Sequence, residues 1–107
     1  MPPSVDNVFK ALTDPTRRSI FEHLAREGEQ AVHALTQRAG VAQPTVSRHL
    51  GVLKRARLVI ERRDGRETHY RARPQALSPV VQWIGVYGAF WHKRLDALDA
   101  LLKRMDQ

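Results

Sequence analysis

Apolar residues recur with helical spacing through most of the chain. Near the N-terminus, four of them lie at i, i+3, i+4 and i+7, namely Val5, Val8, Phe9 and Leu12. This spacing predicts a short amphipathic helix before Thr13. Asp14 and Pro15 predict the start of a second helix, because Asp can accept a bond from a free amide and Pro has no N–H to satisfy. Its expected buried stripe is Ile20, Phe21 and Leu24, and it should end near Gly28.

A helix-turn-helix is predicted at about residues 31–57. Residues 31–39 carry an apolar helical face made of Val32, Leu35 and Ala39. The Gly-Val-Ala sequence at 40–42 then forms a short turn into a helix that opens at Gln43. The inward positions of that helix are Val46, Leu50 and Leu53. Its opposite face presents Gln43, Pro44, Ser47, Arg48, Gly51 and Arg55 to solvent.

Alternating apolar and polar positions replace the helical pattern after Leu58. Residues 58–73 are predicted to form a two-stranded hairpin, whose second strand has Thr68, Tyr70 and Ala72 on one face. Asp64-Gly65 between the strands predicts a type I′ turn, which requires positive φ at both positions. A hairpin directly after a recognition helix is a wing.

The longest apolar pattern predicts a final helix at about residues 78–105, entered through Pro74 and Pro79. Spacings of three and four alternate along it as in a heptad seam. The seam consists of Val81, Ile84, Gly88, Trp91, Leu95, Leu98, Leu102 and Met105, and a second line consists of Val80, Tyr87, Phe90 and Leu101. We expect one side of this helix to pack on its own domain and the other on a second subunit, so the seam up to Leu102 is the candidate dimer interface.

These elements predict one domain over residues 1–107, a mainly α winged helix-turn-helix with a small β-hairpin wing and a long C-terminal dimerisation helix. A chain of 107 residues is too short for a multidomain enzyme. The sequence contains no Ser/His/Asp or Cys/His set, no phosphate-binding glycine motif and no metal-ligand spacing that rises above chance. We therefore expect a protein that is not an enzyme.

Charge is concentrated in one part of the chain. Eighteen Lys and Arg residues against eleven Asp and Glu residues give a net charge of +7 and a pI near 10.8, which favours a polyanionic partner. Residues 43–73 hold nine basic and three acidic residues, which is +6 of that +7. The positive charge thus coincides with the predicted recognition helix and wing, and double-stranded DNA is the expected partner.

The side chains on this surface are of types that can hydrogen-bond bases and phosphates of DNA. Arg can reach guanine and Gln can pair with adenine in the major groove, so base reading is assigned to Gln43, Ser47 and Arg48. Contacts to the DNA backbone, or of the wing, are assigned to Thr45, His49, Arg55, Arg62, Arg63 and Arg66. For His49, one step off the outward face, a packing or capping role is an equal alternative, and for Ser47 the alternative is a solvated hydroxyl.

Three segments resemble the ArsR/SmtB family of winged-helix repressors: VFKALTDPTRRSIFEHL, AGVAQPTVSRHLGVLKRARLV and RRDGRETHYR. The resemblance is strong over residues 5–73 and weak in the final helix. It implies a homodimer that pairs through its terminal helices and represses transcription until an effector releases it. The expected function is therefore a sequence-specific repressor on an inverted-repeat operator. The alternative is a winged-helix module that binds RNA or an acidic protein.

The chain departs from the family at its known sensor sites. Metal-sensing members carry a Cys motif where residues 31–35 read AVHAL, and the sequence has no cysteine. The final helix has one histidine, His92, and neither the Asp-x-His nor the His-x-x-Glu pattern of zinc-binding members. We therefore expect no metal and no cofactor. Arg57 stands where the family often has Gly, which predicts a strained left-handed residue, and Gly51 stands where a polar or basic residue is common.

Three further expectations concern ligand, ion pairs and compartment. The aromatic group Trp83, Tyr87, Phe90 and Trp91 is expected in the core and dimer interface, with a pocket for an organic effector as the alternative. Arg17 and Arg18, in the first turn of a helix, suggest a nearby anion, and Arg18 is expected to pair with Glu22 at i+4. Residues 1–7 carry no secretory signal, no apolar run could span a bilayer and cysteine is missing, so a cytoplasmic protein without a membrane partner is expected.

Overall fold

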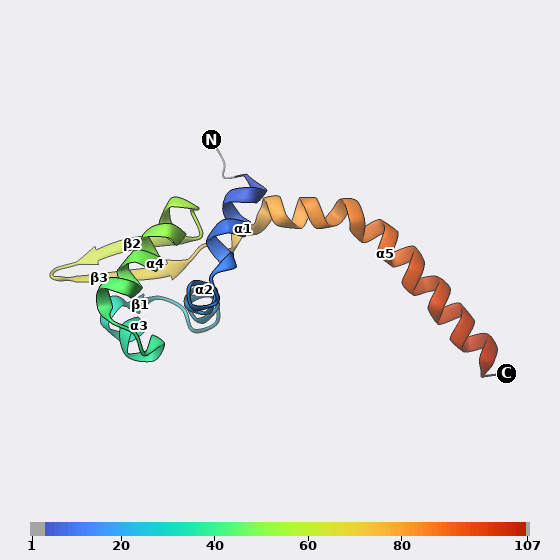
Figure 1. The fold of residues 1–107 in the computed structure, drawn as a ribbon, viewed down its shortest axis with the longest axis horizontal. Coiled ribbons are helices and arrows are strands. Elements are labelled where there is room, and N and C mark those ends of the chain that lie inside the picture. The colour runs from blue at the N-terminus through green and yellow to red at the C-terminus, as the bar shows by residue number, and fades with distance from the viewer. Residues whose placement is uncertain (1–3, 107) are drawn as a thin grey trace.

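The computed structural model describes residues 4–106, and within them the chain forms five α-helices and a small sheet (Figure 1). The elements in order are α1 (Val5–Thr13), α2 (Pro15–Glu27), β1 (Gln30–Ala31), α3 (Val32–Ala39), α4 (Gln43–Arg55), β2 (Val59–Asp64), β3 (Glu67–Ala72), a 3₁₀ turn η1 (Pro74–Leu77) and α5 (Ser78–Met105). The predicted winged helix-turn-helix is confirmed. The expectation of no secretory signal rests partly on residues 1–3, which lie outside the described residues.

The second helix begins as its capping residues predict. The Asp14 side chain accepts a hydrogen bond of 3.0 Å from the backbone N–H of Arg17, and Pro15 is the first residue of α2. After α2, Gly28 has a φ of 86°, a conformation that suits glycine because it has no Cβ. Local chemistry therefore determines both ends of this helix.

The core lies where α1 to α4 meet the sheet. The inward residues predicted for α2 are buried, as are those of α4, and both sets belong to one cluster: Ile20, Phe21, Leu24, Val46, Leu50 and Leu53. Leu35 of α3 is also buried, and Val32 and Ala39 are partly buried against the same cluster. Burying one large apolar side chain stabilises the fold by about 1.5–3 kcal/mol. This cluster is therefore the main stabilising contribution.

The sheet has the antiparallel order β1-β3-β2. Asp64 pairs with Glu67 in the hairpin ladder, so the turn residues are Gly65 and Arg66. Among residues 64–67, φ is positive at Gly65 alone, which is the pattern of a type II′ turn. The predicted type I′ turn at Asp64-Gly65 is therefore wrong by one residue. Strand β1 was not predicted, because two residues are too short to show a period.

Arg57, which follows α4, has a φ of 61°. The left-handed conformation expected from its place in the motif is confirmed. An L-residue in this region is strained by about 1–2 kcal/mol, because its Cβ crowds the following carbonyl oxygen.

Helix α5 leaves the body of the molecule and ends far from the wing (Figure 1). Within Ser78–Met105, all described, no residue is buried. The expectation that one side packs on its own domain holds only near its start, where Trp83 meets Phe9 of α1 edge to face at 5.5 Å. At 1.5 Å per residue, 28 residues span about 42 Å. The molecule measures 66 × 33 × 21 Å, so a helix of this length extends past the body.

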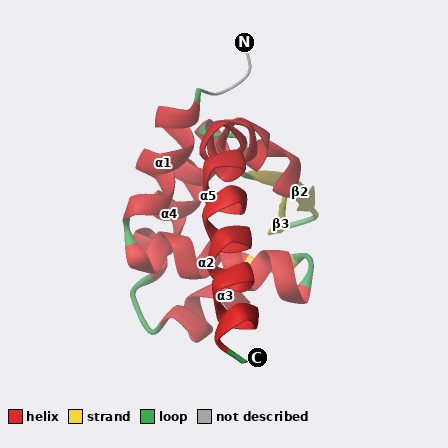
Figure 2. Cartoon of the chain, turned by 90° about the vertical axis from the view of Figure 1, so that its right-hand side faces the viewer, coloured by secondary structure: helices red, strands yellow, loops and turns green. Residues whose placement is uncertain are grey.

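Helices make up most of the molecule, and the strands form a small element beside them (Figure 2). Within residues 4–106, none of these helices is both long enough and apolar enough to cross a lipid bilayer.

Candidate nucleic-acid interface

Helix α4 is fixed to the core by one face and exposes the other. Val46, Leu50 and Leu53 are fully buried, because they follow the i, i+4, i+7 spacing of a single helical stripe. The side chains assigned to base reading, Gln43, Ser47 and Arg48, are all exposed. Thr45 is half-buried and Arg55 is exposed.

The wing comes close to this exposed face of α4. A groove of about 410 Å³ lies between α3, α4 and the hairpin, and among the residues that line it are Gln43, Ser47, Arg63 and Arg66. The fold thus brings together two of the three residues assigned to base reading and two of the arginines assigned to the wing. They are up to 23 positions apart in sequence, so tertiary structure alone makes them one surface.

Arg62 faces a different partner. Its guanidinium donates two hydrogen bonds to Glu29, from Nε to Oε1 at 3.1 Å and from Nη2 to Oε2 at 2.8 Å. The hydrogen bond from Arg62 lowers the pKa of Glu29, and the same pairing raises the pKa of Arg62. Two of the five N–H groups of the guanidinium bond to Glu29 and the Arg62 side chain stays 49% exposed, so its assignment to DNA stays a prediction. The pair ties the wing to the segment before β1.

Glu61 ties the wing to the end of α4. Its Oε2 accepts hydrogen bonds from Lys54 Nζ at 3.1 Å and from the Tyr70 hydroxyl at 2.9 Å. These two bonds, with Lys54 first, lower the pKa of Glu61. Burial, together with the bond to Glu61, raises the pKa of Tyr70 to about 12. One carboxylate therefore joins α4, β2 and β3.

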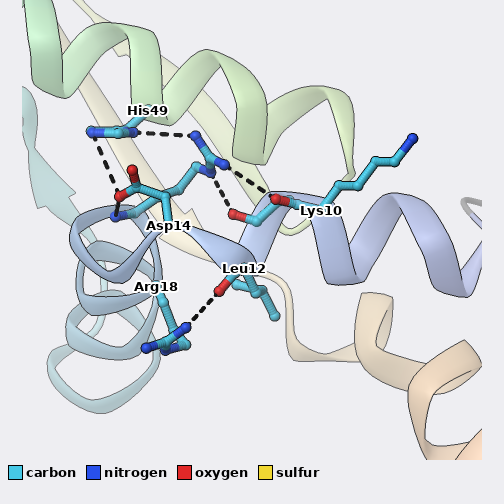
Figure 3. Close-up of polar contacts among 7 residues, drawn as sticks. Lys10, Leu12, Asp14, Arg18 and His49 are labelled. Atoms are coloured by element: carbon cyan, nitrogen blue, oxygen red, sulfur yellow. Dashed lines mark hydrogen bonds and ion pairs between the residues drawn. The ribbon is translucent and has the colours of Figure 1, made fainter.

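His49 points into the protein, although it lies on α4 beside the exposed Ser47 and Arg48 (Figure 3). It is 7% exposed. Its Nδ1 lies 3.4 Å from Arg17 Nη1, and its Nε2 lies 3.9 Å from Asp14 Oδ1. The assignment of His49 to the DNA backbone is therefore corrected in favour of the packing alternative.

Arg17 and Arg18 both bond to the end of α1, as Figure 3 shows for Arg18 and Leu12. Arg17 donates to the carbonyl oxygens of Ala11 and Lys10, and Arg18 Nη1 donates to that of Leu12 at 2.8 Å. The last carbonyls of a helix lack intrahelical partners and carry its negative pole, which suits two cations. The partners of the two guanidinium groups are thus backbone carbonyl oxygens at a helix end, and not the anion that the sequence suggested.

The expected ion pair between Arg18 and Glu22 is wrong. Glu22 lies 3.6 Å from Arg26 instead, also at i+4 spacing. Arg18 and Arg26 are both four residues from Glu22, so spacing does not distinguish them. Arg18 bonds instead to the carbonyl oxygen of Leu12 at the end of α1, and Arg26 pairs with Glu22.

The seam residues of α5 form an exposed apolar surface on the single chain. Each of the large ones is more than half exposed: Val81, Ile84, Trp91, Leu95, Leu98 and Leu102. Gly88 is half-buried. An exposed apolar surface of this extent marks an interaction site.

The aromatic group lies on the same helix, outside the core. Trp83, Tyr87, Phe90 and Trp91 line an open groove of about 540 Å³, together with the seam residues Ile84 and Leu95. The expectation that these rings lie in the core is wrong for the single chain, because α5 projects beyond the core. The groove and the seam are one continuous surface.

Among residues 4–106, no cluster of three or more His, Asp or Glu side chains is arranged to hold a metal ion. His69 comes near such an arrangement, since its Nε2 lies 3.4 Å from Glu67 Oε2. Glu67 Oε1 in turn lies 4.0 Å from His33 Nδ1, so the two histidines approach different oxygens of one carboxylate.

The fold and the exposed basic surface define a winged-helix DNA-binding protein, and comparison with known proteins gives the family. A helix-turn-helix domain family matches residues 12–62. The chain is 39% identical over 99 residues to the arsenical resistance operon repressor of Escherichia coli, covering 92% of this chain and 81% of that protein. The chain belongs to the ArsR family of winged-helix transcriptional regulators and is not an enzyme.

Two further comparisons agree with this family. The arsenic resistance transcriptional regulator ArsR1 of Pseudomonas putida is 42% identical over 77 residues, which are 72% of this chain, and the match spans 57% of that protein's length. A homodimeric winged helix-turn-helix DNA-binding domain from Mycobacterium bovis, solved in solution, superposes with a TM-score of 0.64 at 33% identity and covers 79% of this chain and 78% of that one.

Proposed function

We propose that this regulator is a homodimeric repressor that binds an inverted-repeat operator, with α4 in the major groove and the wing on the flanking backbone or minor groove. The observation that carries the proposal is the groove between α4 and the hairpin, which gathers Gln43, Ser47, Arg63 and Arg66 on one surface. An α-helix fits the major groove, and an adjacent pair of arginines suits phosphate or a narrow minor groove.

The proposed contacts divide by role. Arg48 and Gln43 read bases, since each can make a bidentate contact worth about 1–3 kcal/mol of discrimination, and Ser47 lies beside them. Thr45, Arg55, Arg63 and Arg66 hold the DNA backbone or the minor groove, which sets affinity and orientation more than sequence.

The proposed dimer pairs through α5. Its exposed seam, including the aromatic groove, needs a partner of matching apolar character, and a second copy provides one. A two-fold dimer presents two α4 helices. Half-site centres are then about 34–36 Å apart, one helical turn of DNA, or a multiple of it.

The relatives named for arsenic resistance do not by themselves give the effector of this chain. A thiolate is the usual protein ligand for soft metal ions, and this sequence has no cysteine. We therefore propose that any effector of this regulator acts without a cysteine-bound metal or metalloid.

The test compares binding to the duplex upstream of the protein's own gene with binding to a scrambled duplex at one salt concentration. We expect clearly tighter binding to the first. Equal affinities would contradict a sequence-specific repressor, and tighter binding to a structured RNA or an acidic protein than to either duplex would support the alternative module.

Two variants separate the roles of helix and wing. Arg48→Ala should lower the ratio of specific to nonspecific affinity, because it removes a base contact. Arg66→Ala should weaken binding to both duplexes alike, because it removes a phosphate contact. Both side chains are exposed, so neither variant should alter the fold.

A further inference from the structure

The recognition helix has a buried polar contact that faces away from DNA. His49 is 7% exposed, whereas Ser47 and Arg48, the two residues before it, are exposed. A buried polar group costs stability unless it is hydrogen-bonded, and an apolar side chain at such a place can serve stability equally well. The contacts of the His49 ring therefore need an explanation other than packing.

The partners of the ring determine where its proton lies. A guanidinium has donors and no acceptor, so Arg17 Nη1 donates to Nδ1 of His49 across 3.4 Å. The proton of the neutral ring then sits on Nε2, which faces Asp14 Oδ1 at 3.9 Å. The bond from the Arg17 backbone N–H lowers the pKa of Asp14, so this carboxylate is charged near neutral pH.

Arg17 is itself held from the other side. Its guanidinium donates to the carbonyl oxygens of Ala11 and Lys10, at the end of α1 (Figure 3). Since its donors are fixed on two sides, the guanidinium offers the His49 ring a partner of defined position. The end of α1, the start of α2 and the middle of α4 are thereby joined.

Apolar packing determines which face of α4 turns inward. Val46, Leu50 and Leu53 bury one stripe of the helix, and this burial is non-directional. A hydrogen bond weakens steeply as its angle departs from linearity. The Arg17–His49 bond therefore adds a directional constraint on the rotation of α4 about its axis.

We propose that His49 is a positioning residue for DNA reading. Its bond to Arg17 sets the rotation of α4, and so sets the directions in which Gln43, Ser47 and Arg48 leave the helix. His49 touches no base or phosphate in this role. The inference rests on the proposed function, because it concerns how the proposed reading residues are aimed.

The decisive variants are His49→Leu and His49→Asn in the full chain. Leu fills much of the ring's volume without polar atoms, and Asn places a carbonyl oxygen near the position of Nδ1, where it can accept from Arg17. We expect His49→Leu to lose about tenfold in affinity for the operator duplex, as for one lost base contact, and to keep its affinity for scrambled DNA. We expect His49→Asn to recover most of the loss. Thermal unfolding of each variant tests whether the fold is retained.

Three outcomes would overturn the proposal. His49→Leu could bind the operator as wild type does, or it could lose affinity equally for both duplexes with a smaller salt dependence, which would indicate a direct phosphate contact. His49→Asn could also fail to recover specificity. A wild-type protein that does not prefer its operator would instead refute the proposed function, so the two failures can be told apart.

A double-mutant cycle with Arg17→Met tests the partner. If the two side chains act through one bond, Arg17→Met lowers operator preference as His49→Leu does, and the double variant loses little more than either single variant. Fully additive losses would contradict a shared contact. Arg18→Met is the matched control, because Arg18 also bonds the end of α1 but has no bond to His49.

Discussion

The sharpest structural consequence of the proposed dimer concerns Leu95, a seam residue in the middle of α5. This side chain is 58% exposed on the single chain. Complete burial of a Leu side chain is worth about 1.5–3 kcal/mol, so covering the exposed part contributes about 0.9–1.7 kcal/mol per copy. A two-fold interface contains two copies, which gives about 2–3.5 kcal/mol.

Leu95→Glu removes this contribution and places a carboxylate in the seam, where desolvation adds several kcal/mol per charge. At about 1.4 kcal/mol per factor of ten, we expect the dimer dissociation constant to rise by about 100-fold or more. Sedimentation equilibrium of wild type and variant measures this constant directly. The reduced affinity between subunits should also reduce affinity for an inverted-repeat duplex.

Val86→Glu is the matched control. Val86 precedes Leu95 by nine residues, which places it about 180° away around a helix of 3.6 residues per turn, and it is 72% exposed. We expect its dimer constant to stay close to that of wild type. The proposed seam is refuted if Leu95→Glu remains a dimer of wild-type strength, or if both variants dissociate to the same extent.

Three further predictions concern strain, pH and salt. Arg57→Gly should raise the free energy of unfolding by about 0.5–1 kcal/mol, because relief of the left-handed strain exceeds the entropy cost of glycine; a lower Tm would contradict this. The pKa of Tyr70 is raised from 10.0 to about 12, so its contribution to stability is complete below pH 10 and is lost as pH rises towards 12. Tyr70→Phe should abolish this alkaline loss in denaturant titrations, whereas Tyr87→Phe should keep it. With about eight phosphate contacts per dimer, log K should fall against log salt with a slope of about −7, and Arg66→Ala should reduce it to about −5; an unchanged slope would exclude Arg66 from the backbone.

Features that depend on neighbouring residues could be predicted from the sequence. The start of α2 follows from Asp14 and Pro15, whose capping chemistry is local, and the bounds of α5 follow from a sustained heptad pattern. The buried stripes of α2 and α4 follow from period 3.6. The left-handed Arg57 followed from its place in a recognised motif.

Features that depend on distant residues could not be predicted in the same way. Arg62 and Glu29 are 33 positions apart, and Arg17 and His49 are 32 apart, so periodicity cannot indicate either pair. The same limit explains why the buried His49 was assigned to DNA from its place in a basic segment. Where the fold buries a polar side chain against an internal partner, the charge pattern alone misassigns it.

The extent of α5 beyond the body could not be predicted for another reason. Its apolar pattern indicates how much surface must be covered, and it does not say by which chain. Within residues 4–106, only the first turn of α5 is partly buried, and the seam is exposed.

The central claim is that a two-fold dimer reads a specific sequence, and selection from a library of random DNA duplexes tests it most directly. The purified protein is mixed with the library at fixed salt, and bound duplexes are recovered and sequenced over several rounds. We predict enrichment of one inverted repeat whose half-site centres are about 34–36 Å apart, or a multiple of this distance. Recovery of duplexes with no shared sequence, or of a single half-site with no repeat, would contradict the claim.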